Sequence, residues 1–377
     1  MKNILITGGA GFIGSNLALQ LLQKGHNVTV LDSLAEQIHG AQPELGSSLY
    51  LSIKDKVHFI KGDVTDESVL KNAIEGQQVV VHLAAETGTG QSMYEIKKYV
   101  DVNIGGTALL LDILVNEKTE VEKVVVASSR SIYGEGRYHS EEYGFVYPDH
   151  REVADMDAGF FEVKYKGDKA LSLVATDEDS KVHPSSVYGI TKQNQEQMVL
   201  SVCNAIGISG VAFRYQNVYG PGQSLKNPYT GILSIFSTRI KNGNSINIFE
   251  DGKESRDFVF IDDVVSATIA GIENEAASGQ VYNVGSGVAT DVLTVAKTLI
   301  KNYQKDTDLT ISGNYRIGDI RHNYADLSKI ESQLNFSPQF HFEEGIGHFC
   351  NWVNSQEVNA DGYTDSIEQM KKKGLYR

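Results

Sequence analysis

Short runs of branched apolar residues alternate with helical patterns through the first half of the chain. Five runs are rich in Val, Ile or Leu over their whole length, at 3–7, 27–31, 57–60, 79–83 and 124–127. Apolar residues recur at the spacing of an amphipathic helix at 12–24, 66–75 and about 94–116. Uniformly apolar strands separated by helices are typical of parallel sheets that are covered on both faces. The pattern therefore predicts a Rossmann-type α/β fold, a doubly wound parallel sheet with ligands at the carboxyl ends of its strands.

The alternation breaks from about 135 to 184, where Tyr, Glu, Asp and His are frequent. We expect an inserted loop with a short hairpin, which serves as a lid, an oligomer contact or a mobile excursion. Regular patterns resume with a helix near 187–206 and a strand at 209–214. The prediction is a ligand-binding domain over 1–215 and a smaller α/β substrate domain over 216–377, with 256–285 packing back on the first.

Composition narrows the class of partner. The 377 residues are 41% hydrophobic and 22% charged, and the formal net charge is −14. These values are ordinary for a globular protein, but the acidity argues against a nucleic-acid partner. An anionic substrate would need a few local arginines to hold it.

The ends and the cysteines indicate a cytoplasmic protein. Residues 1–3 run directly into a strand that the fold needs, so no signal peptide is expected. No apolar stretch was found to approach the roughly 20 residues of a membrane span. The two cysteines, Cys203 and Cys350, lie in predicted helices and are interpreted as unpaired, buried thiols of a reducing compartment. No metal site is predicted.

A glycine-rich turn at 7–14 follows the first strand and precedes the first helix. Gly8 suits a tight turn, Gly11 leaves room for a pyrophosphate, and Gly14 allows the helix to pack closely on the strand. The helix N-terminus then faces the phosphates. Asp32 ends the second strand, where a carboxylate accepts hydrogen bonds from ribose hydroxyls and repels a 2′-phosphate. Because no arginine precedes Arg130, the cofactor is predicted to be NAD and not NADP.

Three residues in the middle of the chain suggest acid–base chemistry. Tyr188 and Lys192 are four residues apart on a predicted helix and therefore share a face. A free tyrosine has a pKa near ~10, and a neighbouring ammonium favours the phenolate, which can then take a proton from a hydroxyl. Ser129 closes the fifth strand at the same sheet edge, where it either shares that proton or caps a turn. The combination favours catalysis.

At this point the chain resembles the extended short-chain dehydrogenase/reductase family, specifically its NAD-dependent nucleotide-sugar epimerases and dehydratases. The resemblance covers nearly the whole chain. It is carried by residues 7–14, Asp32, residues 62–64 and 82–85, Asn103, Ser129, Tyr188-x-x-x-Lys192, residues 214–222 and 256–259, and Arg316-x-x-Asp319.

The resemblance implies a tightly bound NAD. In the family, residues equivalent to Asp63 and Val64 flank the adenine, Ala84 and Ala85 line the cofactor, and Tyr215 packs beside the nicotinamide. The expected cofactor residues are Gly8, Gly11, Phe12, Ile13, Gly14, Asp32, Asp63, Val64, Leu83, Ala84, Ala85, Asn103, Ser128, Tyr188, Lys192 and Tyr215.

The resemblance also implies a nucleotide-diphosphate sugar as substrate, held at its diphosphate by Asn217 and Arg256 with help from Arg316. Phe249 is placed against the nucleotide base. The alternatives are surface salt bridges for the arginines and a core position for Phe249. The expected substrate residues are Thr87, Ser92, Ser129, Arg130, Asn217, Gln223, Asn227, Phe249, Arg256, Arg316 and Asp319.

The triplet 129–131 discriminates among reactions. Dehydratases of the family carry Thr-Asp-Glu there, whereas this chain has Ser-Arg-Ser and lacks the carboxyl groups that elimination of water needs. The hypothesis is 4-epimerisation: Tyr188 removes the C4 hydroxyl proton, the C4 hydride passes to NAD, and the 4-keto sugar turns and is reduced on its other face. The alternatives are a 4-keto-6-deoxy sugar reductase and a non-catalytic NAD-binding regulator.

Two loops narrow the resemblance further. Residues 84–94 and 215–231 look most like the dTDP-L-rhamnose 4-epimerase subgroup. Proteins of that subgroup often carry cysteine pairs in the insert, but 135–184 contains no cysteine, so a UDP-sugar substrate stays open. The family also implies a homodimer through the helices near 95–116 and 187–206.

Overall fold

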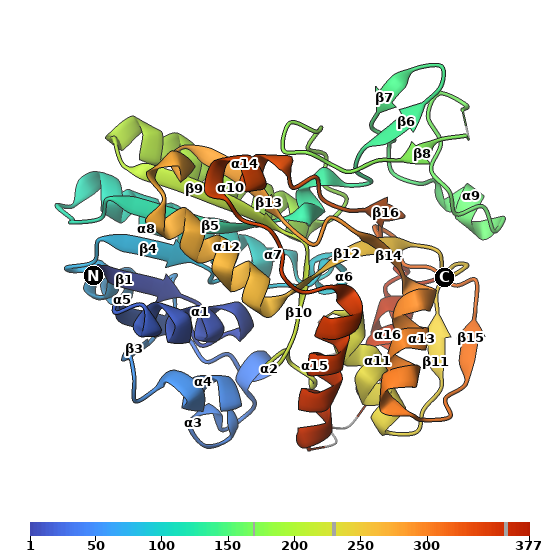
Figure 1. Ribbon diagram of the computed structural model, residues 1–377, viewed down its shortest axis with the longest axis horizontal. Coiled ribbons are helices and arrows are strands. Elements are labelled where there is room, and N and C mark those ends of the chain that lie inside the picture. Colours follow the sequence, from blue (N-terminus) through green and yellow to red (C-terminus); the bar gives the residue numbers. More distant parts are fainter. Residues whose placement is uncertain (169, 228–230, 358–360) are drawn as a thin grey trace.

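The computed structural model describes residues 1–168, 170–227, 231–357 and 361–377. Its largest unit is a seven-stranded parallel sheet with the strand order β13-β9-β5-β4-β1-β2-β3 (Figure 1). The order reverses between β1 and β4, and this reversal opens a crevice at the carboxyl ends of the strands. The sheet confirms the predicted doubly wound fold. Its strands are β1 (Asn3–Thr7), β2 (Asn27–Asp32), β3 (His58–Lys61), β4 (Val79–His82), β5 (Lys123–Ser129), β9 (Ser209–Tyr215) and β13 (Gln280–Val284).

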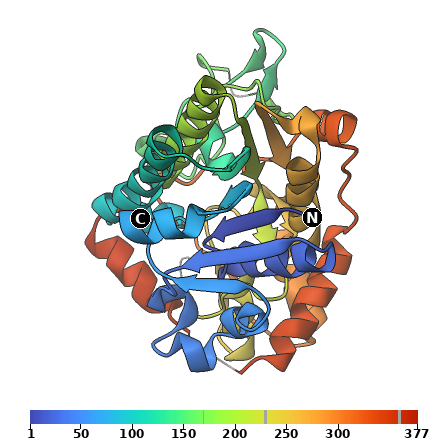
Figure 2. The ribbon, with the colours of Figure 1, turned by 90° about the vertical axis from the view of Figure 1, so that its left-hand side faces the viewer.

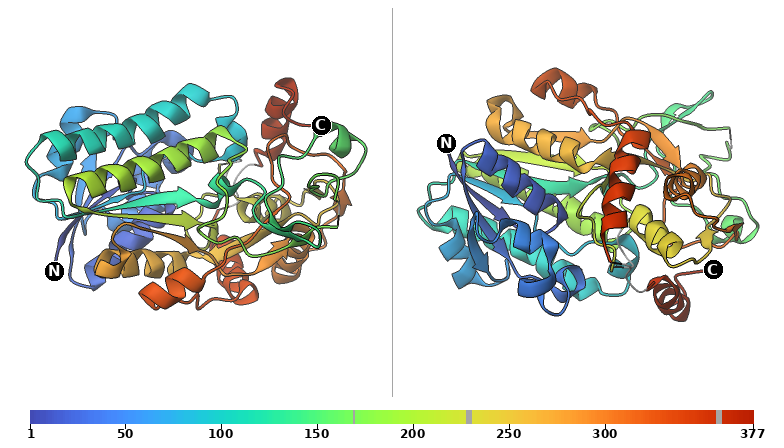
Figure 3. Two further views of the ribbon diagram at one scale, coloured as in Figure 1. Left: turned by 90° about the horizontal axis from the view of Figure 1, so that it is seen from above. Right: turned by 60° about the horizontal axis from the view of Figure 1, so that its bottom comes forward.

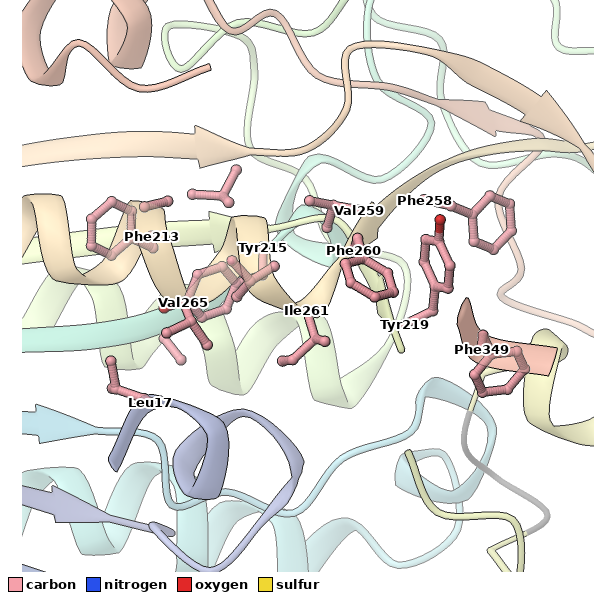
Figure 4. Close-up of a cluster of buried hydrophobic side chains, with 14 of the residues drawn as sticks. Leu17, Phe213, Tyr215, Tyr219, Phe258, Val259, Phe260, Ile261, Val265 and Phe349 are labelled. Carbon is pink, nitrogen blue, oxygen red and sulfur yellow. The ribbon is translucent and has the colours of Figure 1, made fainter. Parts of the chain in front are cut away.

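Helices cover both faces of this sheet (Figures 2 and 3). One face carries α1 (Phe12–Gln23) and α12 (Ile261–Glu273), and the other carries α5 (Glu67–Ile74), α8 (Gly106–Asn116) and α10 (Val187–Ile206). Figure 4 shows Leu17 of α1 and Val265 of α12 packed beneath the sheet near Phe213. Burial of this apolar surface fixes the first turns of α1 and α10 at the crevice.

The chain returns to the large sheet after it has entered the second unit. Strand β13 pairs with β9 in parallel, with Val284 opposite Tyr215, and α12 packs beside α1. Residues 261–284 therefore lie on the large sheet, although they follow the start of the second unit in sequence.

The second unit is smaller and also mixes helices with strands. Its central strand, β12 (Ser255–Phe260), pairs in parallel with β10 (Asn217–Tyr219) and β16 (His322–Asn323), and antiparallel with β14 (Ala289–Asp291). Strands β11 (Ile246–Ile248) and β15 (Leu309–Ile311) form a separate parallel pair. An aromatic cluster around Tyr219 belongs to the same hydrophobic core as Phe213 and Tyr215 of the large sheet, and Figure 4 shows Phe258, Phe260 and Phe349 beside it. The helices of this part of the chain are α11 (Ile232–Lys241), α13 (Val292–Tyr303), α14 (Ser328–Leu334), α15 (Phe342–Ser355) and α16 (Tyr363–Lys372).

The insert forms a small antiparallel sheet of its own. Strands β6 (Tyr138–Ser140) and β7 (Gly144–Val146) make the expected hairpin, and β8 (Ser172–Leu173) adds to its other edge. Helix α9 (Val153–Asp157) follows the hairpin and lies toward the second unit in Figure 1. A bridge from Thr176 to Ala325 ties the returning chain to the second unit.

Two stretches differ from the expected elements. Residues 36–53 form three short helices, α2 (Glu36–His39), α3 (Pro43–Gly46) and α4 (Ser48–Ile53), where no element was predicted. The helix expected at 94–116 begins at Ile96 and contains a π-helical turn: α7 (Ile96–Tyr99) continues into Val100–Gly105 and then into α8, and the separate short helix α6 (Thr89–Ser92) precedes it. Such π-helical turns are rare and frequent at functional sites.

One helical segment meets the length and composition of a membrane span, which differs from the expectation. It runs from Ile96 to Asn116. In the structure its apolar residues Leu110, Leu111 and Leu114 are buried in the core between the sheet and its helical layer. Packing in this fold accounts for these residues, while Ile96, Val100 and Val115 of the same segment are exposed.

Candidate active site

A cavity of about 490 Å³ lies at the carboxyl edge of the large sheet. It brings together residues from strands that are far apart in sequence, as the strand reversal requires. The sequence-predicted residues that line it are Gly8, Gly11, Phe12, Ile13, Gly14, Asp32, Asp63, Val64, Leu83, Ala84, Ala85, Thr87, Ser128, Ser129, Arg130, Tyr188, Lys192, Tyr215, Asn217 and Gln223.

The glycine turn packs too tightly for side chains at Gly8, Gly9 and Gly14. Gly8 has a φ of +68°, and a Cβ there would lie 2.7 Å from the backbone nitrogen of Ala84. A Cβ on Gly14 would lie 2.5 Å from the carbonyl oxygen of Gly8. Around Gly11, in contrast, a Cβ would meet only that same oxygen, at 3.2 Å. The turn thus leaves open space directly before the N-terminus of α1.

Asp32 lies at the far end of the cavity from the serine strand. Its carboxylate accepts hydrogen bonds from the backbone N–H groups of Ala10 (2.9 Å) and Leu34 (2.8 Å). His39 stands beside it, with Nε2 3.7 Å from the Asp32 Oδ1 atom. Burial lowers the pKa of His39, against the pull of the carboxylate. His39 and its cavity neighbours Gln37 and Leu49 were not predicted, because their place depends on the short helices α2 and α4.

Tyr188 and Ser129 meet at the end of the cavity opposite Asp32. Tyr188 is in the first turn of α10, and its backbone N–H donates to the Ser92 Oγ atom at 3.0 Å. Burial raises the pKa of Tyr188, while a hydrogen bond with Ser129 and the charge of Arg130 oppose that rise. The Ser129 hydroxyl also pairs with the Ser131 hydroxyl at 3.0 Å. A second hydroxyl from Ser131, which also lines the cavity, thus extends the proton-sharing group.

Lys192 is close to the same group but bonds elsewhere. Its Nζ donates to the carbonyl oxygen of Ala127 at 2.9 Å, and the side chain is buried. Burial lowers the pKa of Lys192 to about 7. In this arrangement the charge of Arg130 opposes the rise in the pKa of Tyr188, and the predicted role of Lys192 toward Tyr188 stays a prediction.

Arg130 is half-buried and lines the cavity beside Ser129. Its Nε donates to the Asn217 Oδ1 atom at 2.5 Å, which fixes the side chain against β10. Burial, followed by the like charge of Arg256, lowers the pKa of Arg130 to about 9. Asn217 thereby orients a cation beside Tyr188.

Seven of the predicted residues do not line this cavity. Asn103, in the π-helical turn, accepts a hydrogen bond from the Glu86 N–H (2.7 Å) and donates to the Thr191 hydroxyl (2.9 Å). It therefore holds the cavity wall against α10 from behind. Ser92 lies beneath Tyr188, and Asn227 is buried next to Gln37. Residues 228–230 of the quoted 215–231 segment lie outside the described residues.

The other four lie in the second unit. The Arg256 guanidinium donates to the carbonyl oxygens of Ile320 (2.7 Å) and Arg321 (2.9 Å). Arg316 pairs with Asp319 at 2.7 Å and lies over the Phe249 ring, 5.4 Å from its centroid. The Phe249 ring also packs against the Tyr376 ring, so part of its surface is already covered by the protein.

Fold and cavity together define a dinucleotide-binding α/β protein with serine, tyrosine and lysine at the cofactor end. The chain belongs to the NAD dependent epimerase/dehydratase family, which matches residues 4–151 and 166–285. This result confirms the predicted family.

Individual relatives extend over almost the whole chain. A dTDP-L-rhamnose 4-epimerase of Burkholderia thailandensis is 36% identical over 95% of this chain and 96% of its own length. A UDP-glucose 4-epimerase of Mycolicibacterium smegmatis is 32% identical over 91% and 95%. Among solved structures, the UDP-glucuronic acid 4-epimerase of Bacillus cereus, in complex with UDP-glucuronic acid and NAD, superposes with a TM-score of 0.76. It is 26% identical and covers 93% of this chain and 99% of the other.

The residues present fit the NAD of this family. Open space at Gly11 before the α1 N-terminus suits a pyrophosphate, because the unpaired N–H groups there favour anions. The Asp32 carboxylate at the end of β2 suits ribose hydroxyls. Gly8, Gly11 and Asp32 would hold the dinucleotide, and Tyr215 and Ser128 line the catalytic end.

Proposed function

We propose that the protein is an NAD-dependent nucleotide-sugar 4-epimerase that acts on a dTDP- or UDP-linked sugar through a transient 4-keto sugar. The observation that carries the proposal is that Ser129, Tyr188 and Lys192 line the same cavity as the glycine turn and Asp32. Relatives that are 4-epimerases of both nucleotide classes support it. When bound, NAD supplies the acceptor and donor for the C4 hydride.

The chain's own groups account for the proton transfers. Tyr188 takes the proton of the C4 hydroxyl, and the Ser129 hydroxyl, already paired with it, shares that proton. Arg130 favours the phenolate by its charge. Lys192 lies on the same helix face, four residues from Tyr188, and its Nζ is held by the Ala127 carbonyl. On the return step Tyr188 gives the proton back to the C4 oxygen on the other face of the sugar.

Positively charged side chains support a diphosphate substrate on an acidic protein. Arg130 and Asn217 line the cavity at its catalytic end, and Arg256 lies close enough to lower the Arg130 pKa. Guanidinium groups suit phosphate oxygens because they offer paired N–H donors. Arg316 and Asp319 extend this side of the site into the second unit.

The role of Arg130 leads to a prediction about pH. Removal of its charge in Arg130→Met raises the pKa of Tyr188, so a smaller fraction of phenolate is present at neutral pH. We expect the rate of C4 inversion to fall about tenfold at pH 7, with a partial recovery toward pH 9, since one pKa unit corresponds to a tenfold change. Initial rates measured between pH 6 and 10 check this. Arg130→Lys keeps the charge, so the rise of its rate with pH should occur at the same pH as in the wild type. An equal shift of this rise in both variants would contradict the electrostatic role.

The function is tested with purified protein and no added NAD. A panel of dTDP- and UDP-sugars is incubated with the protein, and inversion at C4 is followed by NMR. We expect inversion of at least one sugar without external cofactor. Turnover that requires stoichiometric NAD(P)H would instead identify a 4-keto sugar reductase, and binding of NAD with no turnover of any sugar would identify a regulator.

We further propose a cytoplasmic homodimer. Apolar side chains at the start of the helical segment 96–116 and on α10 are unusually exposed: Ile96 by 52%, Val100 by 38% and Ile190 by 46%. A self-complementary helical interface would cover them. The buried free thiols of Cys203 and Cys350 suit a reducing compartment. Light scattering on the protein as it elutes from a size-exclusion column measures the mass of the assembly directly.

A further inference from the structure

The end of the chain is packed into the protein more deeply than its composition indicates. Its lysine run, Lys371 to Lys373, is exposed. The apolar residues around it are not: Met370 is 3% exposed, Tyr376 7% and Ile367 8%. We call residues 361–377 the tail. Its buried side chains pack with Phe249.

The tail pairs with the loop that carries Arg316. Backbone hydrogen bonds join Tyr315 and Arg377 in both directions, at 2.8 and 3.0 Å, and the Ile317 N–H donates to the Leu375 carbonyl at 3.0 Å. This is a short antiparallel pairing with Arg316 opposite Tyr376. The Tyr376 ring meets Phe249 edge to face at 5.4 Å, and the Arg316 guanidinium lies over the same Phe249 ring. Three side chains therefore fix one another.

The tail also contacts the half of the protein that carries the cofactor cavity. Met370 and Leu375 share a nearly filled space with Gly90, Met93 and Ser186 on one side and with the 316–319 loop on the other. Ser186 caps α10, two residues before Tyr188. Lys373 lies over the Tyr94 ring, 4.7 Å from its centroid.

Both ends of the tail are anchored. At its start, Asp361 pairs with Arg239 of α11 at 2.9 Å. At its end, the Arg377 guanidinium lies 3.2 Å from the Asp157 carboxylate of α9, which also accepts a hydrogen bond from the Tyr315 hydroxyl at 2.5 Å. Figure 3 (left) shows α16 and the end of the chain beside α9. The tail thus connects the second unit, the insert and the cofactor half.

We propose that the tail is part of the substrate site: it holds the Arg316–Asp319 loop at a fixed position relative to Tyr188, and Tyr376 is the positioning residue for Phe249 and Arg316. This inference rests on the proposed function, because it assigns the loop to the diphosphate-nucleotide end of a nucleotide sugar. The groups that bind the nucleotide and the group that reacts at C4 belong to different units of the fold. Because the tail contacts both units, it keeps the bound sugar at a fixed position relative to Tyr188.

The experiment compares two variants with the wild type. In one, the chain ends after Gly374, which removes the pairing with 315–317; in the other, Tyr376→Ala removes only the ring. Lys372→Ala, at an exposed position of the tail at the end of α16, is the matched control. Each protein is assayed for KM and kcat of C4 inversion, for affinity for UDP and dTDP by calorimetry, for bound NAD and for the temperature of unfolding.

We expect KM and the nucleotide Kd to rise about tenfold in both variants, which corresponds to about 1.4 kcal/mol of binding. Bound NAD should be unchanged and kcat within about threefold of the wild type, because Tyr188 and the cofactor cavity are intact. Nucleotide affinity and KM that equal those of the wild type would overturn the inference. So would a fall in NAD content, kcat and unfolding temperature together, since that pattern describes a purely structural tail. Failure of the proposed function shows in the wild type itself, whereas failure of this inference shows in the ratio of variant to wild type.

Discussion

Replacing Tyr188 with Phe is expected to lower the rate of C4 inversion by about 10³-fold or more, within or above the usual contribution of acid–base catalysis. The substitution removes one oxygen atom, and with it the group that takes the proton of the C4 hydroxyl in the proposed mechanism and later returns it. The ring keeps its edge-to-face contact with Tyr99, and the backbone N–H keeps its bond to Ser92. The cavity should therefore keep its shape. NMR of the product and absorbance of the cofactor released on denaturation measure turnover and bound NAD in the same sample.

The chain offers a matched control for this substitution. Tyr138 of the insert is buried, and its hydroxyl makes no hydrogen bond within the part of the chain that the structure describes. Tyr138→Phe should therefore leave turnover at the wild-type level. Substantial activity in Tyr188→Phe would show that another group moves the proton and would remove Tyr188 from the mechanism.

Replacing Arg321 with Met is expected to destabilise the protein by about 3–5 kcal/mol, which is the range for removing one partner of a buried ion pair. The Arg321 side chain is fully buried and joins acidic groups from the insert and the second unit. Its guanidinium lies 2.5 Å from Glu162, 2.9 Å from Glu250 and 2.7 Å from Asp251. Without it, the remaining carboxylates repel one another in a poorly hydrated space. Urea denaturation measures the loss.

The loss should depend on pH in a defined direction. Burial raises the pKa of Glu254 to about 7, and Arg321 opposes that rise. A carboxyl group whose pKa is higher in the folded than in the unfolded state favours folding at low pH, and that contribution disappears as the pH rises through the folded pKa. Removal of Arg321 raises this pKa further, so the deficit of the variant should be larger at pH 8 than at pH 6. An equal deficit at both values would contradict the account.

A surface ion pair provides the comparison for this experiment. Lys24 and Glu273 pair at 3.0 Å, with both side chains more than 40% exposed. Lys24→Met should change the free energy of unfolding by less than about 1 kcal/mol, with little dependence on pH.

The large sheet was predictable because its strands are continuous apolar runs. Strand β1 has the predicted bounds, and β2, β4 and β5 differ from prediction by a few residues at most. These strands are buried on both faces, so most of their positions carry apolar side chains. The helices α2 to α4 could not be found in this way. Each is only four to six residues long, too short to be stable alone, and tertiary contacts such as the His39–Ser47 hydrogen bond hold them in place.

The residues of the candidate site also divide into those that were predictable from the sequence and those that were not. Residues that belong to strand ends and to the glycine turn were predicted, and they line one cavity because parallel strands share an edge. Contacts that depend on side-chain direction were not predictable. Examples are the bond from Lys192 to the Ala127 carbonyl and the position of Arg130, whose charge opposes the rise in the Tyr188 pKa. The burial of Tyr376 against Phe249 likewise depends on a return of the chain that no local pattern indicates.

The measurement that tests the proposed mechanism most directly follows the hydrogen atom at C4. A nucleotide sugar that is converted by the wild type is prepared with deuterium at C4 and incubated with the purified protein without added NAD. The account predicts a product of inverted configuration that keeps the deuterium at C4, because the same hydride leaves and returns within one turnover. Loss of the deuterium to solvent or to an added pool of NAD would contradict it.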